Sequence, residues 1–169
     1  MNKENLEKIF NDDLGTSLFP LLAEIYFEEG DYKRAQKVLN AGLLLNPNNN
    51  DGKFIQAKIA MINSDTKIAI KLLKDIIKSD GLYINAMKML ILYYQSSGTN
   101  HASMVRILHQ ILDLLPDDEF SNDIIKTIKK KSPTSKKRKK VTQVKSRKPS
   151  TIQSKKNKRT PLKSSTADS

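Results

Sequence analysis

Residues 19–47 read FPLLAEIYFEEGDYKRAQKVLNAGLLLNP, and this stretch decides the fold of the chain. Apolar residues recur at helical spacing on both sides of Glu29-Gly30-Asp31, a tripeptide that favours a tight turn. Two short amphipathic helices joined by that turn are therefore expected. The small residues Ala23 and Ala35 stand where the two helices would have to approach closely.

The pattern returns with a period of about 34 residues, a length typical of helical-hairpin repeats. Ala23 corresponds to Ala57 and then to Ile91. The period also aligns Tyr26 with Ala60 and Tyr94, Gly30 with Ser64 and Gly98, Ala35 with Ala69, Leu39 with Leu73, and Pro47 with Gly81. The third unit needs one extra residue in its turn, near Thr99–His101. Self-similarity of this period indicates an array of helical hairpins.

The apolar spacing predicts an all-α chain. We expect six helices within the three units, at about 17–29, 32–45, 51–62, 66–79, 84–96 and 101–115. A short helix is expected at 2–11, with Leu6, Ile9 and Phe10 on one face. A capping helix is expected at about 118–131, with acids at its start and lysines at its end, as the helix dipole favours.

The order Phe19, Leu22, Ala23, Tyr26, Ala35, Leu39 and Pro47 resembles the tetratricopeptide repeat (TPR) family. The family pattern is W-x2-L-G-x2-Y…A-x3-F…P. Phe19 replaces the Trp, Ala23 the Gly and Leu39 the Phe. The resemblance covers residues 16–117 and weakens in the third unit, where Ile91 replaces the small residue. It implies an α-solenoid of three hairpins that acts as a binding scaffold.

In the TPR family the first helix of each unit lines an inner groove that contacts a peptide. Carried over, the resemblance implies these groove residues: Glu24, Phe27, Glu28, Phe54, Lys58, Met61, Ile62, Lys88, Leu92 and Gln95. The apolar members suit an amphipathic helix or an apolar peptide. Pro20 and Glu24 stand where chaperone-docking members hold a carboxylate, which argues against that mechanism. The alternative is that the apolar residues pack against the N-terminal segment or a longer superhelix.

The C-terminal part differs in composition. Residues 126–169 contain 17 of the 30 Lys and Arg residues and one of the 18 acidic residues. Residues 132–169 are rich in Ser, Thr and Lys and are expected to be disordered, because they cannot bury enough apolar surface. The predicted organisation is an N-terminal segment (1–15), a helical-repeat domain (16–131) and a basic tail (132–169).

The basic residues of the tail form clusters that suit a polyanion. They are Lys136, Lys137, Arg138, Lys139, Lys140, Lys145, Arg147, Lys148, Lys155, Lys156, Lys158 and Arg159. Such clusters are typical of nucleic-acid arms, nuclear localisation signals and contacts to anionic membranes. The tail lacks aromatic residues, which argues against base stacking. Two alternatives are a purely solubilising tail and binding of the tail to its own acidic body, at Glu24, Glu28, Glu29 and Asp31.

Catalytic signals are missing from the sequence. There is no Cys, and His101 and His109 do not share a metal-ligand spacing. No HExxH, phosphate-binding Gly-rich loop or GxSxG sequence occurs. We therefore expect no enzyme activity, no catalytic residue, no metal, no cofactor and no small-molecule substrate.

The N-terminus lacks the apolar run of a signal peptide, and no apolar stretch approaches the roughly 18 residues of a membrane span. A cytoplasmic protein is expected, with the nucleus as the alternative in a eukaryote. The function predicted first is an adaptor that binds another protein or peptide, with the tail adding electrostatic attachment. The alternative is a nucleic-acid-associated or membrane-surface-associated protein whose tail is the main contact.

Overall fold

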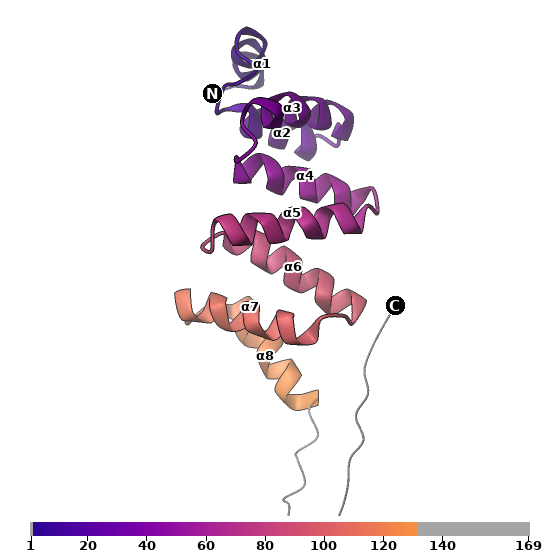
Figure 1. Ribbon diagram of the computed structural model, residues 1–169, viewed down its shortest axis with the longest axis vertical. Helices are drawn as coiled ribbons and strands as arrows, with labels where there is room; N and C mark the ends of the chain where they lie inside the picture. The colour runs from indigo at the N-terminus through magenta and orange to yellow at the C-terminus, as the bar shows by residue number, and fades with distance from the viewer. Residues whose placement is uncertain (1, 132–169) are drawn as a thin grey trace, which may run out of the picture. The chain divides into compact units, whose positions relative to one another are not determined.

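The computed structural model describes residues 2–131, and within them it contains eight α-helices and no strand (Figure 1). The helices are α1 (Lys3–Asp12), α2 (Phe19–Glu28), α3 (Tyr32–Leu45), α4 (Asn50–Ile62), α5 (Thr66–Ser79), α6 (Ile84–Ser97), α7 (His101–Leu114) and α8 (Glu119–Lys131). The prediction of an all-α fold is confirmed, with each expected helix present. The tail predicted to be disordered, residues 132–169, lies outside the described residues.

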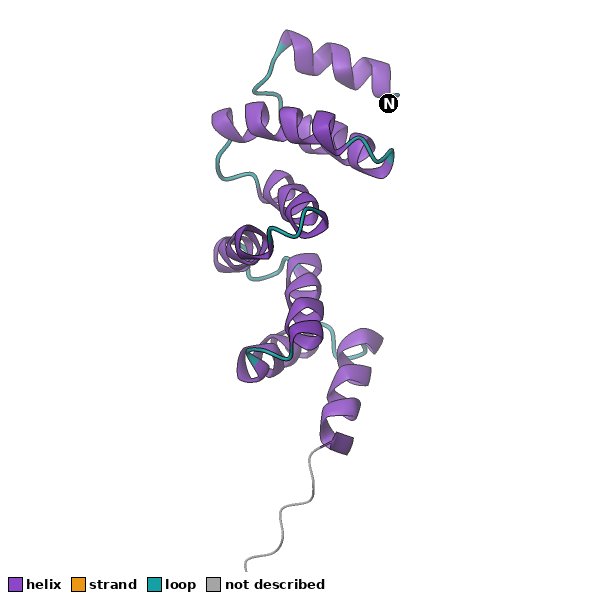
Figure 2. Cartoon of the chain, turned by 90° about the vertical axis from the view of Figure 1, so that its right-hand side faces the viewer, coloured by secondary structure: helices purple, strands orange, loops and turns teal. Residues whose placement is uncertain are grey.

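Successive helices pair as hairpins. α2 packs on α3, α4 on α5 and α6 on α7, and the second helix of each of the first two pairs also packs on the first helix of the next. We call α2, α4 and α6 the first helices and α3, α5 and α7 the second helices. Beyond α3, Figure 2 shows the helices alternating between two sides of the stack. This arrangement is that of a helical-repeat, solenoid-like body.

The second helices bury the same positions in each hairpin. The buried sets are Ala35, Leu39 and Gly42; Ala69, Leu73 and Ile76; and Met104, Leu108 and Ile111. The spacing i, i+4, i+7 places each set on one helix face. The first two sets are one sequence period apart, and the third set lies one position further along. This extra position confirms the one-residue insertion expected before the last second helix.

Phe19 fixes how α2, α3 and α4 meet. Its side chain is 0% exposed and lies against two glycines, Gly42 of α3 and Gly52 of α4. A Cβ atom at either glycine would lie 2.2 Å or 2.6 Å from the Phe19 ring, respectively. The absence of side chains at these two positions therefore makes room for the ring.

The turns inside the hairpins share one backbone feature. Gly30, Ser64 and Gly98 follow one another at the sequence period and have φ angles of 77°, 65° and 65°. This left-handed region is readily accessible to glycine and costs other residues free energy. The period thus aligns three turns of similar conformation, as the sequence predicted.

A helix covers each end of the hairpin stack. Leu6 and Phe10 of α1 are buried against the first hairpin, and Ile9, predicted to share their face, is half-buried. Ile124 of α8 is buried against the last hairpin, with Phe120 partly buried beside it. These two helices shield apolar surface that the terminal hairpins would otherwise expose.

Candidate functional site

Three of the predicted groove residues meet around a fourth, Lys58 of α4. Its Nζ atom lies 2.6 Å from Oε1 of Glu24 and 3.7 Å from Oε1 of Glu28, both on α2. The same Nζ lies 4.0 Å from the centre of the Phe27 ring, a distance typical of a cation–π contact. A ligand carboxylate would have to displace these glutamates to reach Lys58. The cluster therefore joins two first helices and leaves Lys58 with its charge already balanced.

Phe54 lies one turn before Lys58, in a hollow of about 340 Å³ that Pro20, Glu24 and Asn85 also line. Its ring centre lies 5.4 Å from that of Tyr83. The Tyr83 hydroxyl donates a 2.7 Å hydrogen bond to Oδ1 of Asp51. Burial, and then the hydrogen bond to Asp51, raise the pKa of Tyr83 well above its ordinary value. Tyr83 is therefore a neutral hydrogen-bond donor at physiological pH.

An apolar hollow lies between α4 and α6. It has a volume of about 550 Å³ and is lined by Met61, Met89, Leu92, Tyr93, Gln95 and Ser96. Leu92 is 51% exposed, although it is a large apolar side chain. Methionine side chains are flexible and adapt to differently shaped partners. We call this feature the Met61–Leu92 hollow.

Lys88 of α6 is held by the capping helix. Its Nζ donates a 2.5 Å hydrogen bond to Oδ1 of Asp118 and lies 5.4 Å from the centre of the Phe120 ring. Burial alone would raise the pKa of Asp118, but the hydrogen bonds from Lys88 and Ser121 hold it below its ordinary value. Asp118 also caps α8, since it accepts the Ser121 N–H at 2.9 Å. Lys88 is thus a structural contact of α8 in this arrangement.

The structure divides the ten predicted groove residues among these features. Glu24, Phe27, Glu28 and Lys58 form one cluster; Phe54 lies in the adjacent hollow; Met61, Leu92 and Gln95 line the Met61–Leu92 hollow; and Lys88 binds α8. Ile62 is 48% exposed and does not line that hollow. The apolar residues do not form one unbroken stripe, because Lys58 lies over Phe27 and Tyr83 packs on Phe54.

The sequence did not single out Met89 and Tyr93, which complete the Met61–Leu92 hollow. Met89 precedes Leu92 by three positions, and Tyr93 follows Met89 by four. Such spacings place side chains on adjoining parts of one helix surface. The family pattern gave no reason to select these two, whereas helical spacing from Leu92 would have pointed to Met89.

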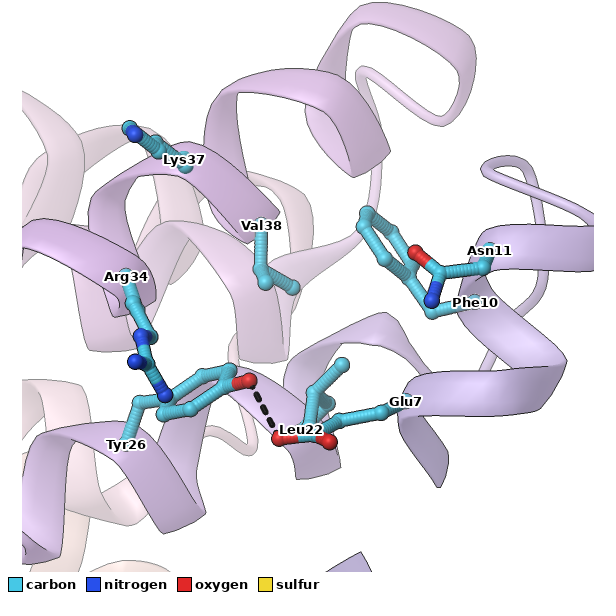
Figure 3. Close-up of a pocket in the computed structure, with 8 residues that line it drawn as sticks. All are labelled: Glu7, Phe10, Asn11, Leu22, Tyr26, Arg34, Lys37 and Val38. Atoms are coloured by element: carbon cyan, nitrogen blue, oxygen red, sulfur yellow. Dashed lines mark hydrogen bonds between the residues drawn. The ribbon is translucent and has the colours of Figure 1, made fainter. Parts of the chain in front are cut away.

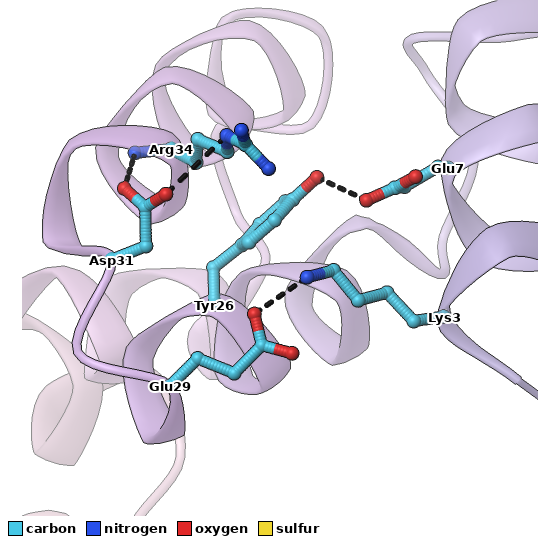
Figure 4. A network of polar contacts seen from close by, with 6 residues as sticks. All are labelled: Lys3, Glu7, Tyr26, Glu29, Asp31 and Arg34. Carbon is cyan, nitrogen blue, oxygen red and sulfur yellow. Dashed lines mark hydrogen bonds and ion pairs between the residues drawn. The ribbon is translucent and has the colours of Figure 1, made fainter.

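A polar network joins α1 to the first hairpin (Figure 4). The Tyr26 hydroxyl donates a 2.6 Å hydrogen bond to Oε1 of Glu7. Burial, and then the contact with Glu7, raise the pKa of Tyr26 above its ordinary value. Figure 3 shows the two side chains bordering a hollow of about 300 Å³, with Arg34 beside Tyr26. The network orients α1 on α2.

All four acids proposed to receive the basic tail already lie beside a cation of the body. Lys58 approaches Glu24 and Glu28, as described above, and Lys3 binds Glu29 at 2.5 Å (Figure 4). Arg34 approaches Asp31 at 3.3 Å. A tail that bound here would compete with these intramolecular partners. The predicted tail residues, Lys136 to Arg159, lie outside the described residues.

Within residues 2–131, no group of three or more His, Cys, Asp or Glu side chains is arranged to hold a metal ion. No helix in this part of the chain is long and apolar enough to cross a membrane. Comparison of the chain with protein-family models and with curated proteins returned no match.

Proposed function

We propose that this chain is a non-catalytic, TPR-like scaffold that binds another polypeptide through its first helices. The observation that carries the proposal is the Met61–Leu92 hollow, an apolar concavity of about 550 Å³ formed by two first helices. Binding sites are commonly concave and mostly apolar, with a few polar groups that fix orientation. Gln95 and Ser96 supply such polar groups in the lining of this hollow.

The partner that fits best is an amphipathic helix. Such a helix would insert one or two apolar side chains between Met61 and Leu92, as in other helix-in-groove complexes. Its polar flank would face Lys58 and the two glutamates that balance it. Because Lys58 is already neutralised, apolar contact would supply most of the affinity.

The test is to select amphipathic helical peptides by display against the full chain and to measure their affinity by fluorescence anisotropy. Leu92→Glu puts a charge into the hollow and should weaken binding at least about tenfold, because the charge must be desolvated or excluded. Leu82→Glu is the matched control, since Leu82 is 68% exposed and does not line the hollow.

The control variant should keep the affinity of the unmodified chain. If Leu92→Glu and Leu82→Glu bound the selected peptides equally well, the first-helix surface around Leu92 would not be the binding site. Because both residues are exposed, neither substitution should change the fold, and circular dichroism would check this.

A second candidate function assigns the main contact to the tail. The observation that favours it is compositional: the tail sequence combines the basic clusters named above with a single acid, Asp168. Removal of residues 132–169 should then abolish binding to nucleic acid or anionic vesicles. Under the first proposal the same truncation would leave peptide binding unchanged. The chain would in either case act by binding and not by catalysis.

A further inference from the structure

Charge is distributed unevenly between the two kinds of helix in the hairpins. The second helices contain eight Lys and Arg residues and two acids, Asp75 and Asp113. The first helices contain three basic and three acidic residues. The basic residues of the second helices are Lys33, Arg34, Lys37, Lys67, Lys71, Lys74, Lys78 and Arg106. The second helices are therefore strongly basic, whereas the first helices are balanced.

These basic side chains occupy equivalent, exposed positions. Lys37, Lys71 and Arg106 each lie two residues after the first buried position of their helix, at Ala35, Ala69 and Met104. The same register aligns Lys33 with Lys67, and Lys74 with His109. Because the buried faces are equivalent, the exposed faces are too, and the basic residues form rows that run from one second helix to the next. We call this surface the second-helix face.

The charges of this face are available to a ligand. Arg34 pairs with Asp31. None of the other seven basic residues forms an ion pair within residues 2–131. On α5, Lys67, Lys71, Lys74 and Lys78 follow one another at intervals of four, three and four residues and so share one side of the helix. Such a like-charged row disfavours the isolated helix and favours an anionic partner.

A hollow of about 550 Å³ opens beside α3. The residues that line it are Tyr32, Lys33, Gln36, Lys37, Asn40, Ile59 and Asn63. Lysine ammonium groups, amides and tyrosine hydroxyls are the side-chain groups that hydrogen-bond the phosphates and sugars of nucleic acids. The hollow thus adds neutral donors to the rows of positive charge.

We propose that the second-helix face, centred on Lys37, Lys71 and Lys74, binds the phosphate backbone of a nucleic-acid duplex. Charge complementarity supports an extended polyanion, because the row of Lys37, Lys71 and Arg106 continues over three helices. A duplex fits better than a single strand, since Tyr32 is the one aromatic residue of the three second helices, and its ring is half-buried, with its centre 5.5 Å from that of Phe27.

A membrane surface fits less well. Interfacial helices insert large apolar side chains into the lipid beside their basic residues. Among the lysines of α5, Ile68 is the one large apolar side chain that is exposed. The α5 part of the face is therefore electrostatic rather than amphipathic, whereas α3 also exposes Leu44. Binding would show little sequence preference, because phosphate contacts carry no base information.

The test measures binding of the full chain to a DNA duplex of about two helical turns as a function of salt concentration. The test variant combines Lys37→Gln, Lys71→Gln and Lys74→Gln. The matched control combines Lys8→Gln, Lys53→Gln and Lys126→Gln, which lie on α1, α4 and α8 and change the net charge equally. Each neutralised phosphate contributes about −0.9 to the slope of log K against log salt. The test variant should therefore lose about 2–3 units of slope and at least about tenfold in affinity at about 0.1 M salt.

The control should keep the slope of the unmodified chain, and the triple Lys→Arg variant at positions 37, 71 and 74 should bind as the unmodified chain does. Equal slopes for the test and control variants, or no duplex binding at low salt, would overturn the proposal. It would also be overturned if the test variant lost binding to phosphatidylserine vesicles or to polyglutamate but kept duplex binding. All these positions except Lys53 are exposed, so a common unfolding midpoint is expected.

Discussion

The ring of Phe19 occupies the space into which a side chain on Gly42 would point. A Cβ atom at Gly42 would lie 2.2 Å from Cγ of Phe19, and both residues are buried. Cγ is attached directly to Cβ, so this part of the ring cannot move away unless α2 moves with it. The contact therefore determines the separation of α2 and α3.

Gly42→Ala should lower the free energy of unfolding by about 2 kcal/mol. Alanine is favoured over glycine within a helix by about 1 kcal/mol, but overpacking of a core typically costs about 1–3 kcal/mol and occasionally more. Because the distance to Cγ is so short, we expect an overpacking cost near or above the upper end of that range. Urea unfolding followed by circular dichroism would measure the difference.

Gly81→Ala is the control for this substitution. A Cβ atom at Gly81 would meet only Nε2 of Gln110, at 3.8 Å, which is an ordinary contact. Its effect on stability should stay within about 0.5 kcal/mol, as for other surface substitutions. If Gly42→Ala were as stable as Gly81→Ala, the packing of Phe19 would not limit the approach of α2 and α3.

At the turn that contains Ser64, introducing glycine should stabilise the protein, whereas removing glycine from the equivalent turn at Gly30 should destabilise it. Ser64 has a φ of 65°, in the region that Gly30 and Gly98 also adopt. Ser64→Gly should raise the free energy of unfolding by about 0.5 kcal/mol, because relief of the backbone cost exceeds the added entropy of the unfolded chain. Gly30→Ala should lower it by about 1 kcal/mol, although a Cβ there would meet nothing within 4 Å. Thermal unfolding of both variants would measure these changes. Changes in the free energy of unfolding that had the same sign in both variants would contradict the prediction.

The sequence period predicted much of this structure because a helical repeat is defined by local spacing. Glu24 and Lys58 are one period apart and occupy equivalent positions on neighbouring first helices, so the period itself brings them close. The three positive-φ turns follow from the same period. Helix bounds match the expected ones for α3 and α5 and differ by at most two residues for the others, as is usual for helix ends.

The contacts that the sequence did not predict depend on tertiary packing. Lys88 and Asp118 lie on different elements, and their pairing depends on how α8 covers the last hairpin. The sequence did not show that Gly42 and Gly52 make room for the Phe19 ring, because glycine in a sequence more often indicates a turn. The Met61–Leu92 hollow likewise requires the distance between α4 and α6, which periodicity does not define.

We expect the hydrogen bond between Tyr26 and Glu7 to stabilise the packing of α1 on the first hairpin. Tyr26→Phe removes the 2.6 Å hydrogen bond and should cost about 1 kcal/mol. Amide hydrogen exchange in α1 should accelerate more than exchange in α5. The folded-state pKa of Tyr26 is raised, so this contribution is full below pH 10 and is lost as the pH rises through the folded-state pKa.

Tyr32→Phe is the control for that measurement. The Tyr32 hydroxyl forms no hydrogen bond within residues 2–131, and its ring contact with Phe27 would persist in phenylalanine. Its exchange pattern should match that of the unmodified chain. Equal protection of α1 in the Tyr26 and Tyr32 variants would show that the apolar contacts of Leu6 and Phe10 hold α1 without the polar network.

The pair formed by Asp118 and Lys88 predicts a pH-dependent contribution to stability. Because the folded-state pKa of Asp118 is lowered, the contribution is present above the ordinary aspartate pKa, near 4, and is lost as the pH falls through the folded-state value. At pH 7, Asp118→Asn should cost about 2 kcal/mol, since a charged hydrogen-bond acceptor is removed from Lys88. At pH 2.5 the cost of Asp118→Asn should be much smaller.

Asp123→Asn is the control, because this carboxylate is 74% exposed. It should change stability by less than about 0.5 kcal/mol at either pH. A cost for Asp118→Asn that did not change between pH 7 and pH 2.5 would show that the charge of Asp118 is not what stabilises the start of α8.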